Sequence, residues 1–202
     1  MSMGKPMAHR RRNITASLIL LAASCLFALV TWVAAPEALA KGGGSACAKW
    51  GKTAPERLQP GQAREAIVCL LNAERSSRGL RPLERNKKLQ KAAQRHNEEM
   101  LGTGCFAHEC PGEPTLDERL EGVSYLVGSL VEWAFGENVA WGLKDRGAPR
   151  AIVAAWMDSS GHRANILHRD FREVGVGFSA GTPDSNSDPG GIYTTDFGLR
   201  VG

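Results

Sequence analysis

Two histidines and one glutamate are the strongest candidates for chemistry in this sequence. His108 and His162 each lie in a segment punctuated by glycine or proline, with polar neighbours. Glu137 follows a glycine and lies among apolar residues, where a carboxylate must find a partner or remain protonated. Two imidazoles and one carboxylate could bind zinc and leave one coordination position open, or act as general acids and bases. Zinc is therefore the candidate cofactor, with His108 and His162 as its ligands.

Two further interpretations of these residues stay open. In a metal-free enzyme, His162 would be the base, and Ser159 or Ser160 would be the nucleophile. In a structural role, Glu137 would accept backbone hydrogen bonds and His108 would orient a loop. The three candidate residues are far apart in the sequence, so their spacing alone does not bring them together.

The first forty residues have the order of a secretory signal peptide. Residues 1–13 are basic, residues 14–35 contain no charged side chain, and Ala38-Leu39-Ala40 gives the small-x-small pattern that signal peptidase accepts. We expect cleavage after Ala40, which makes residues 1–40 a leader and the body a secreted protein. The alternative is an uncleaved membrane anchor, because the apolar run is long enough to span a bilayer. The basic residues before that run place the body outside the cytoplasm in both cases.

The net charge of +4 belongs mostly to the leader. Residues 1–40 carry four basic and one acidic side chain, whereas residues 41–202 carry 21 basic and 20 acidic ones. A nearly neutral body lacks the electrostatic surface that nucleic-acid binding requires, so we exclude DNA and RNA as partners. The hydrophobic share of 43% is ordinary for a globular protein and too high for a disordered one.

Export also decides how the cysteines are interpreted. The body keeps Cys47, Cys69, Cys105 and Cys110. Four thiols in an oxidising compartment predict two disulfides, with three possible connectivities. Cys105 and Cys110 are close enough to close a small loop, which would leave Cys47 for Cys69. A thiolate zinc site is the weaker alternative, because the sequence has no Cys-x-x-Cys pair.

The elements that must position these residues follow from hydrophobic spacing and from turn signals. Residues 41–61 are rich in glycine and proline and are typical of a flexible linker. Asn86 is a candidate N-cap, and Thr115 with Glu118 forms a candidate capping box. Residues 132–141 are ambiguous. The pattern predicts helices over 63–79, 86–101, 115–121 and 148–158, and strands over 173–179 and 192–201. Helices that precede the strands indicate an α+β fold.

Several ordered motifs resemble one protein family. Residues 136–140, Gly-Glu-Asn-Val-Ala, resemble the G-E-N-[IL]-A motif of the CAP superfamily, which comprises cysteine-rich secretory proteins, antigen 5 and pathogenesis-related group one proteins. Residues 156–167 closely resemble the bacterial signature W-x-x-S-x-G-H-R-x-N-I-L, and residues 173–177 follow at the expected distance. Residues 71–75 and 80–83 are similar to the family's first helix and its exit. The resemblance covers the chain from about Arg64 to the C-terminus, and several ordered motifs are more specific than one.

The resemblance implies a three-layer α-β-α sandwich with a mainly antiparallel central sheet, formed by residues 62–202. It also implies a central cavity lined by two histidines and two acidic residues. Carried over by motif, these are His108, Glu137 and His162, whereas the second glutamate of animal and plant members falls on Ser159. Asp158 lies beside that position and is the candidate substitute.

By resemblance, we expect an exported binding module rather than an enzyme. Its cavity or groove would take a small apolar molecule, a divalent cation or an extended peptide, at the cell envelope or outside the cell. The polar trio would orient the ligand while apolar walls supply affinity. One alternative is a zinc-dependent or serine hydrolase that uses His108, Glu137 and His162. Another is a structural envelope protein with an inert cavity.

Overall fold

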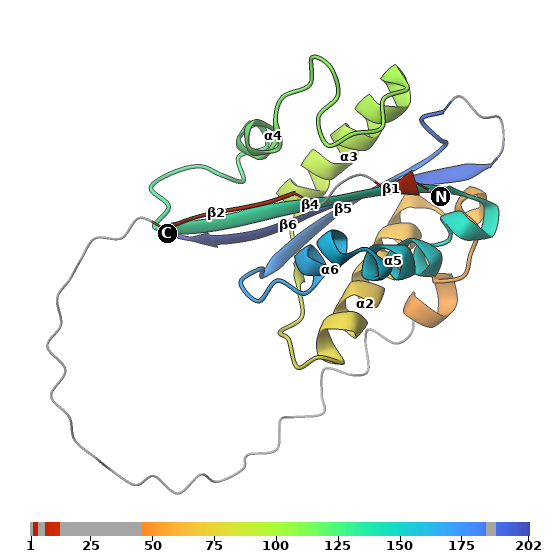
Figure 1. Cartoon of the computed structure of the whole chain (residues 1–202), viewed down its shortest axis with the longest axis horizontal. Coiled ribbons are helices and arrows are strands. Elements are labelled where there is room, and N and C mark those ends of the chain that lie inside the picture. Colours follow the sequence, from red (N-terminus) through yellow and green to blue (C-terminus); the bar gives the residue numbers. More distant parts are fainter. Residues whose placement is uncertain (1, 4–6, 13–45, 185–188) are drawn as a thin grey trace, which may run out of the picture.

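The computed structural model describes residues 2–3, 7–12, 46–184 and 189–202 (Figure 1). The expected apolar run of the leader and its cleavage site after Ala40 lie outside the described residues. Within the described ranges, no helix is both long enough and apolar enough to cross a membrane.

The centre of the molecule is a mixed, mainly antiparallel sheet. Its strand order is β1-β4-β6-β5-β3, and β2 also pairs with β4. Only β3 and β5 pair in parallel, and the other described pairs are antiparallel. The strands are β1 (Ser2–Met3), β2 (Met7–Arg12), β3 (Glu84–Arg85), β4 (Glu132–Leu143), β5 (Glu173–Ala180) and β6 (Gly190–Val201).

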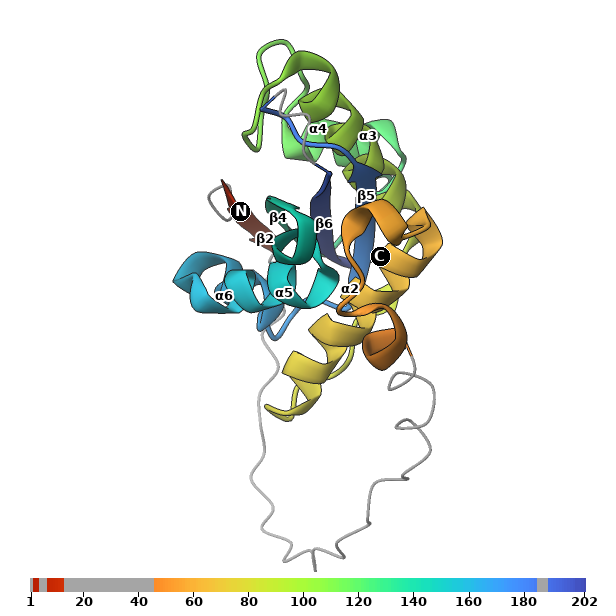
Figure 2. The same cartoon turned by 90° about the vertical axis from the view of Figure 1, so that its right-hand side faces the viewer.

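Helices cover both faces of this sheet, which confirms the predicted α-β-α sandwich (Figure 1 and Figure 2). One face carries α2 (Pro60–Ser76), α5 (Pro149–Asp158) and α6 (Ser160–Ile166), and the other carries α3 (Lys87–Thr103) and α4 (Leu116–Gly122). Two short 3₁₀ helices, η2 (Pro55–Arg57) and η3 (Lys144–Gly147), precede α2 and α5.

Local capping signals begin two helices where the sequence predicts. The Asn86 side chain accepts hydrogen bonds from the backbone N–H groups of Lys88 and Leu89 at the start of α3. Thr115 and Glu118 form the expected capping box at the start of α4. The segment that was ambiguous in the sequence forms the long strand β4. Its residues 134–140 are all buried. A strand that is buried on both faces loses the alternation that would reveal it in a sequence.

Two glycines bring α3 close to the sheet. A Cβ atom at Gly175 would overlap the backbone of Leu89 and Gln90, and one at Gly177 would overlap the backbone of Ala93. Glycine at both positions therefore lets α3 lie directly on β5. This close approach places the next turn of α3, which carries His96, against the sheet.

Both disulfides are those that the spacing favoured. Cys47 joins Cys69 and Cys105 joins Cys110. The first bridge ties the short helix at residues 46–50 to α2, and the second closes the loop that follows α3.

The described hydrophobic core lies entirely between Leu58 and Phe197. The largest cluster is between the sheet and α2, α5 and α6, and two smaller clusters lie under α3 and α4. Residues 46–202 contain these clusters and both disulfides.

Candidate functional site

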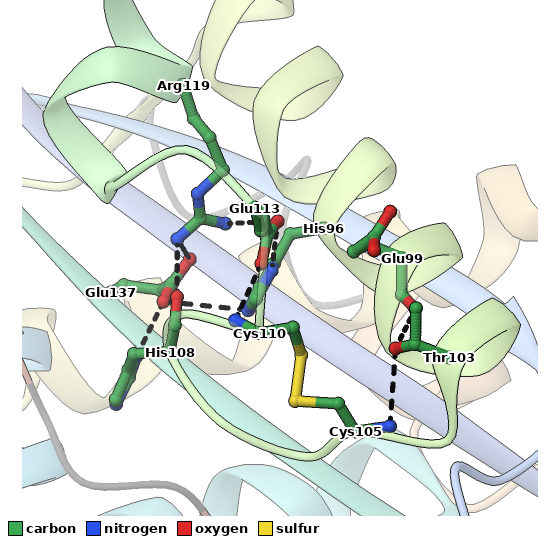
Figure 3. Close-up of a disulfide and its surroundings, with 9 residues drawn as sticks. All are labelled: His96, Glu99, Thr103, Cys105, His108, Cys110, Glu113, Arg119 and Glu137. Atoms are coloured by element: carbon green, nitrogen blue, oxygen red, sulfur yellow. Dashed lines mark hydrogen bonds and ion pairs between the residues drawn. A yellow bond between two sulfur atoms is a disulfide. The ribbon is translucent and has the colours of Figure 1, made fainter.

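Glu137 is at the centre of a buried charged cluster between the sheet and the α3–α4 layer (Figure 3). Its side chain is fully buried. Nδ1 of His108 lies 2.5 Å from Oε1 of Glu137, and Nη2 of Arg119 lies 2.9 Å from Oε2. An ionised carboxylate only accepts hydrogen bonds. His108 therefore carries a proton on Nδ1 and donates a hydrogen bond from it to Glu137. The family resemblance implied that His108 and Glu137 line one cavity, and neither it nor the residue spacing indicated Arg119.

The disulfide-closed loop between α3 and α4 positions His108. Cys105 and Cys110 close this loop, and Arg119 donates to the backbone carbonyl of His108 at 2.9 Å. The His108 side chain is 11% exposed, whereas those of Arg119 and Glu137 are 6% and 0% exposed. Nε2 of His108 has no hydrogen-bond partner among the described residues. This nitrogen is itself buried, so a ligand could contact it only by entering the cluster beside the partly exposed ring.

His96 and Glu113 form a second tier behind Glu137. Nδ1 of His96 lies 2.7 Å from Oε1 of Glu113, and its Nε2 lies 3.9 Å from Oε1 of Glu137. Glu113 also accepts from the backbone N–H of Cys110 and lies 3.7 Å from Arg119. Sequence reasoning missed both residues. The available signal was a histidine within the apolar stripe of α3, which must be matched by a polar partner when it is buried.

Asp196 on β6 adds a second buried carboxyl group beside Glu137. The two residues are directly opposite in the β4–β6 register, and Asp196 is also fully buried. Burial and the negative charge of Glu137 raise the pKa of Asp196 well above its ordinary value. The surroundings of Asp196 therefore favour its neutral form. No sequence motif indicated this residue.

Glu137 itself stays ionised. Burial alone would raise its pKa, but Arg119, the hydrogen bond from His108 and the nearby His96 together lower it below its ordinary value. Burial also opposes the charge of Arg119, yet its carboxylate neighbours, led by Glu137, raise the pKa of Arg119. The cluster thus shifts the pKa values of two adjacent carboxyl groups in opposite directions, that of Glu137 down and that of Asp196 up.

His162 belongs to the opposite layer of the fold. It lies on α6, and its Nδ1 is 2.7 Å from Oγ of Ser159. Its backbone carbonyl accepts from Asn138 of β4 at 3.1 Å. Asn138 and Glu137 are consecutive on the strand, so their side chains face opposite sides of the sheet. His162 therefore flanks β4 from the α6 side, while His108 approaches from the α3–α4 side.

Asp158 and the predicted zinc site do not coincide with the buried cluster. Asp158 ends α5 and is exposed, so it lies outside the buried cluster. In the part of the chain that the structure describes, no three or more His, Cys, Asp or Glu side chains are grouped so that they could hold a metal ion.

A three-layer sandwich with a histidine–carboxylate cluster on strand β4 is the arrangement that the family resemblance implied. The chain belongs to the Cysteine-rich secretory protein (CAP) family, whose pattern matches residues 68–197.

Curated relatives include two proteins of Bacillus subtilis (strain 168). The uncharacterized protein YkwD is 36% identical over 133 residues, which are 65% of this chain and 45% of YkwD. The uncharacterized membrane protein YlbC is 32% identical over 115 residues, which are 57% of this chain and 31% of YlbC. The chain thus spans less than half the length of either relative.

Solved structures agree on the fold. An extracellular protein from Bacillus anthracis that contains an SCP domain superposes with a TM-score of 0.54 and 28% identity, over 68% of this chain and 40% of that one. An outer surface protein from Borrelia burgdorferi superposes with the same TM-score and 18% identity, over 67% and 90% of the two chains.

Proposed function

We propose that this CAP-family chain is an exported binding module. In this proposal, residues 1–40 are removed and the body works outside the cell or at the cell envelope. Two disulfides support export, because such bonds persist in oxidising compartments. The extracellular Bacillus anthracis relative supports the same location.

The observation that carries the proposal is the change in exposure across the cluster. Glu137 is fully buried, whereas its partner His108 is partly exposed. Arg119, the hydrogen bond from His108 and the nearby His96 lower the pKa of the fully buried Glu137. The buried Nε2 of the outer member, His108, has no hydrogen-bond partner among the described residues. A pre-organised polar group at the margin of an apolar region is typical of ligand sites.

Apolar side chains adjoin this polar margin. Glu137, Val139 and Trp141 alternate on β4 and therefore face the same side of the sheet. Trp141 and Phe106 are only partly buried, and both pack against the small cluster that contains Val139. Such surroundings fit a small apolar molecule with a polar head, a divalent cation or a peptide, the head being oriented by His108.

Histidine side-chain NMR tests this proposal on residues 41–202. The probes are Zn²⁺, sodium dodecanoate and a peptide with the sequence of residues 1–12. We expect at least one probe to shift the Nε2 resonance of His108 saturably, and Glu137→Gln to weaken that binding about tenfold, the loss of about 1.4 kcal/mol. Glu109→Gln, at an exposed position next to His108, is the matched control and should leave binding unchanged.

The binding proposal is wrong if no probe shifts the Nε2 resonance of His108 and if His108→Ala changes only the free energy of unfolding. The cluster is then a scaffold.

One contact favours a second candidate, a serine hydrolase. Oγ of Ser159 lies 2.7 Å from Nδ1 of His162, which is the distance expected between a nucleophile and its base. A fluorophosphonate probe would then label Ser159, and His162→Ala would abolish the labelling. An unlabelled wild-type protein would remove this candidate.

A further inference from the structure

The outer edge of β4 differs from its inner edge. Along the inner edge, β4 pairs with β6 over all twelve residues, Glu132–Leu143. Along the outer edge, the described residues that pair with β4 form two short segments, β2 opposite Glu132–Glu137 and β1 opposite Ala140–Trp141. An edge strand presents backbone N–H and C=O groups that another extended chain can pair with.

This edge runs beside the candidate site. Strand β2 begins opposite Glu137, the residue that binds His108, and ends opposite Glu132. It also contacts α6, the helix that carries His162, and Figure 2 shows it along the sheet edge on the side of that helix. An extended segment at this position therefore passes between the two elements that carry the predicted site histidines.

The occupant of the edge, residues 7–12, belongs to the leader that the proposed function removes. Removal of the leader would expose the outer groups of Glu132–Glu137 next to His108.

We propose that the outer edge of β4 binds an extended basic peptide as an added antiparallel strand, and that residues 7–12 occupy this position until the leader is removed. The inference rests on the proposed function and names its ligand class. Main-chain hydrogen bonds supply affinity in this mode of recognition, and side-chain pockets supply specificity.

Charge favours a basic partner. Residues 7–12 read Met-Ala-His-Arg-Arg-Arg, whereas β4 contains no lysine or arginine. Of the two glutamates of β4, Glu137 is already paired with His108 and Arg119, so the charge argument rests on Glu132. Arg12 is opposite Glu132 in the strand register, and opposite charges at facing positions favour strand pairing. The partner is thus expected to carry two or three cations after a short apolar start.

Fluorescence anisotropy tests the inference with a labelled peptide of residues 1–12 and the leader-free protein, residues 41–202. We expect saturable binding. A peptide of the same composition in scrambled order should bind at least about tenfold more weakly, because the register with β4 is lost. Hydrogen exchange should slow at alternate amides of Glu132–Glu137 when the peptide is bound, since only every second N–H faces the added strand.

Two proline peptides give the sharpest control. Successive N–H groups of a strand point to opposite sides, so one of Ala8→Pro and His9→Pro removes a hydrogen bond to β4 and the other does not. We expect one of the two to lose at least about tenfold in affinity and the other to be close to the unmodified peptide. If the two proline peptides and the scrambled peptide bound with equal affinity, binding would depend on charge alone, and the inference would be wrong.

Failure of this inference and failure of the proposed function are distinguishable. If the peptide does not bind while Zn²⁺ or dodecanoate still shifts His108, the strand-addition inference is wrong and the binding module stands.

Discussion

Two arginines are buried on opposite faces of the sheet, and their partners differ. Arg75 of α2 donates to four backbone carbonyls, those of Arg81, Ile166, His168 and Phe171, at 2.8 to 3.2 Å. On the other face, Arg119 of α4 meets the side chains of Glu137 and Glu113 and one carbonyl. Both cations are removed from water, but only one is matched by formal negative charge.

The difference separates a structural role from a functional one. Carbonyl groups do not titrate, so Arg75 fastens α2 to the segment after α6 whatever the state of its surroundings. Burial, together with the neighbouring Arg172, lowers the pKa of Arg75 to about 10, and it remains charged at neutral pH. The partners of Arg119 are titratable groups linked to His108, which reaches the margin of the fold. Arg119 therefore stabilises the ionised form of Glu137, whereas Arg75 holds backbone segments together through their carbonyl groups.

Replacing Arg75 should have the largest effect. Arg75→Ala leaves four carbonyls without their donor, and we expect a loss of about 4 kcal/mol in the free energy of unfolding, equal at pH 4 and pH 7. Urea unfolding at both pH values measures it. Arg78→Ala, which removes an exposed ion pair with Glu74 one turn away, is the control and should cost less than about 0.5 kcal/mol. A loss that varied with pH would remove the contrast with Arg119.

Arg119→Met should come second and should depend on pH. Without the cation, only His108 and His96 oppose the effect of burial on the charge of Glu137, so we expect a loss of about 3 kcal/mol at pH 7. The pKa of Glu137 in the folded variant then lies above its unfolded value, so the folded state binds the extra proton. The loss should therefore shrink as the pH falls to 4.

The same unfolding measurements check this variant. Arg95→Met, at an exposed position on α3, is the matched control. An effect of Arg119→Met that is the same at both pH values would mean that Arg119 is a structural tie like Arg75.

Asp196→Asn should have the smallest effect and the opposite sign. The pKa of Asp196 is raised in the folded state, so its contribution to stability is present below the unfolded pKa of about 3.8 and is lost as the pH rises above it. Asparagine resembles the protonated acid, so the variant should be more stable than the wild type at pH 8, by on the order of 1 kcal/mol, and equal near pH 3.

Thermal unfolding across this pH range gives the measurement. Asp158→Asn, at an exposed position, should be neutral throughout. Destabilisation by Asp196→Asn at pH 8 would show that this carboxyl is ionised in the fold.

The predictions that the structure confirms at the level of single residues come from local signals in the sequence. Asn86 and the Thr115–Glu118 box act within three residues of themselves, so their chemistry is complete before any tertiary contact forms. The short separation of Cys105 and Cys110 is local in the same sense, and it also decided the second bridge. The family motif around Glu137 added the sandwich fold, which the described elements confirm.

The inner half of the site depends on contacts that no local pattern records. Asp196 is 59 positions after Glu137 and meets it only through the β4–β6 register, in which a shift of one residue would turn it to the other face. His96 reaches the cluster because glycines on β5 let α3 approach the sheet.

The sequence by itself therefore determined the caps, the favoured disulfides and the class of fold, and it singled out His108 and Glu137 as candidates without pairing them. The tertiary structure decided which groups share the charge of Glu137, namely Arg119, His96, Glu113 and Asp196, and on which side of β4 His162 lies. The physical reason is that capping is short-ranged along the chain, whereas the protonation of a buried carboxyl depends on every charge packed around it.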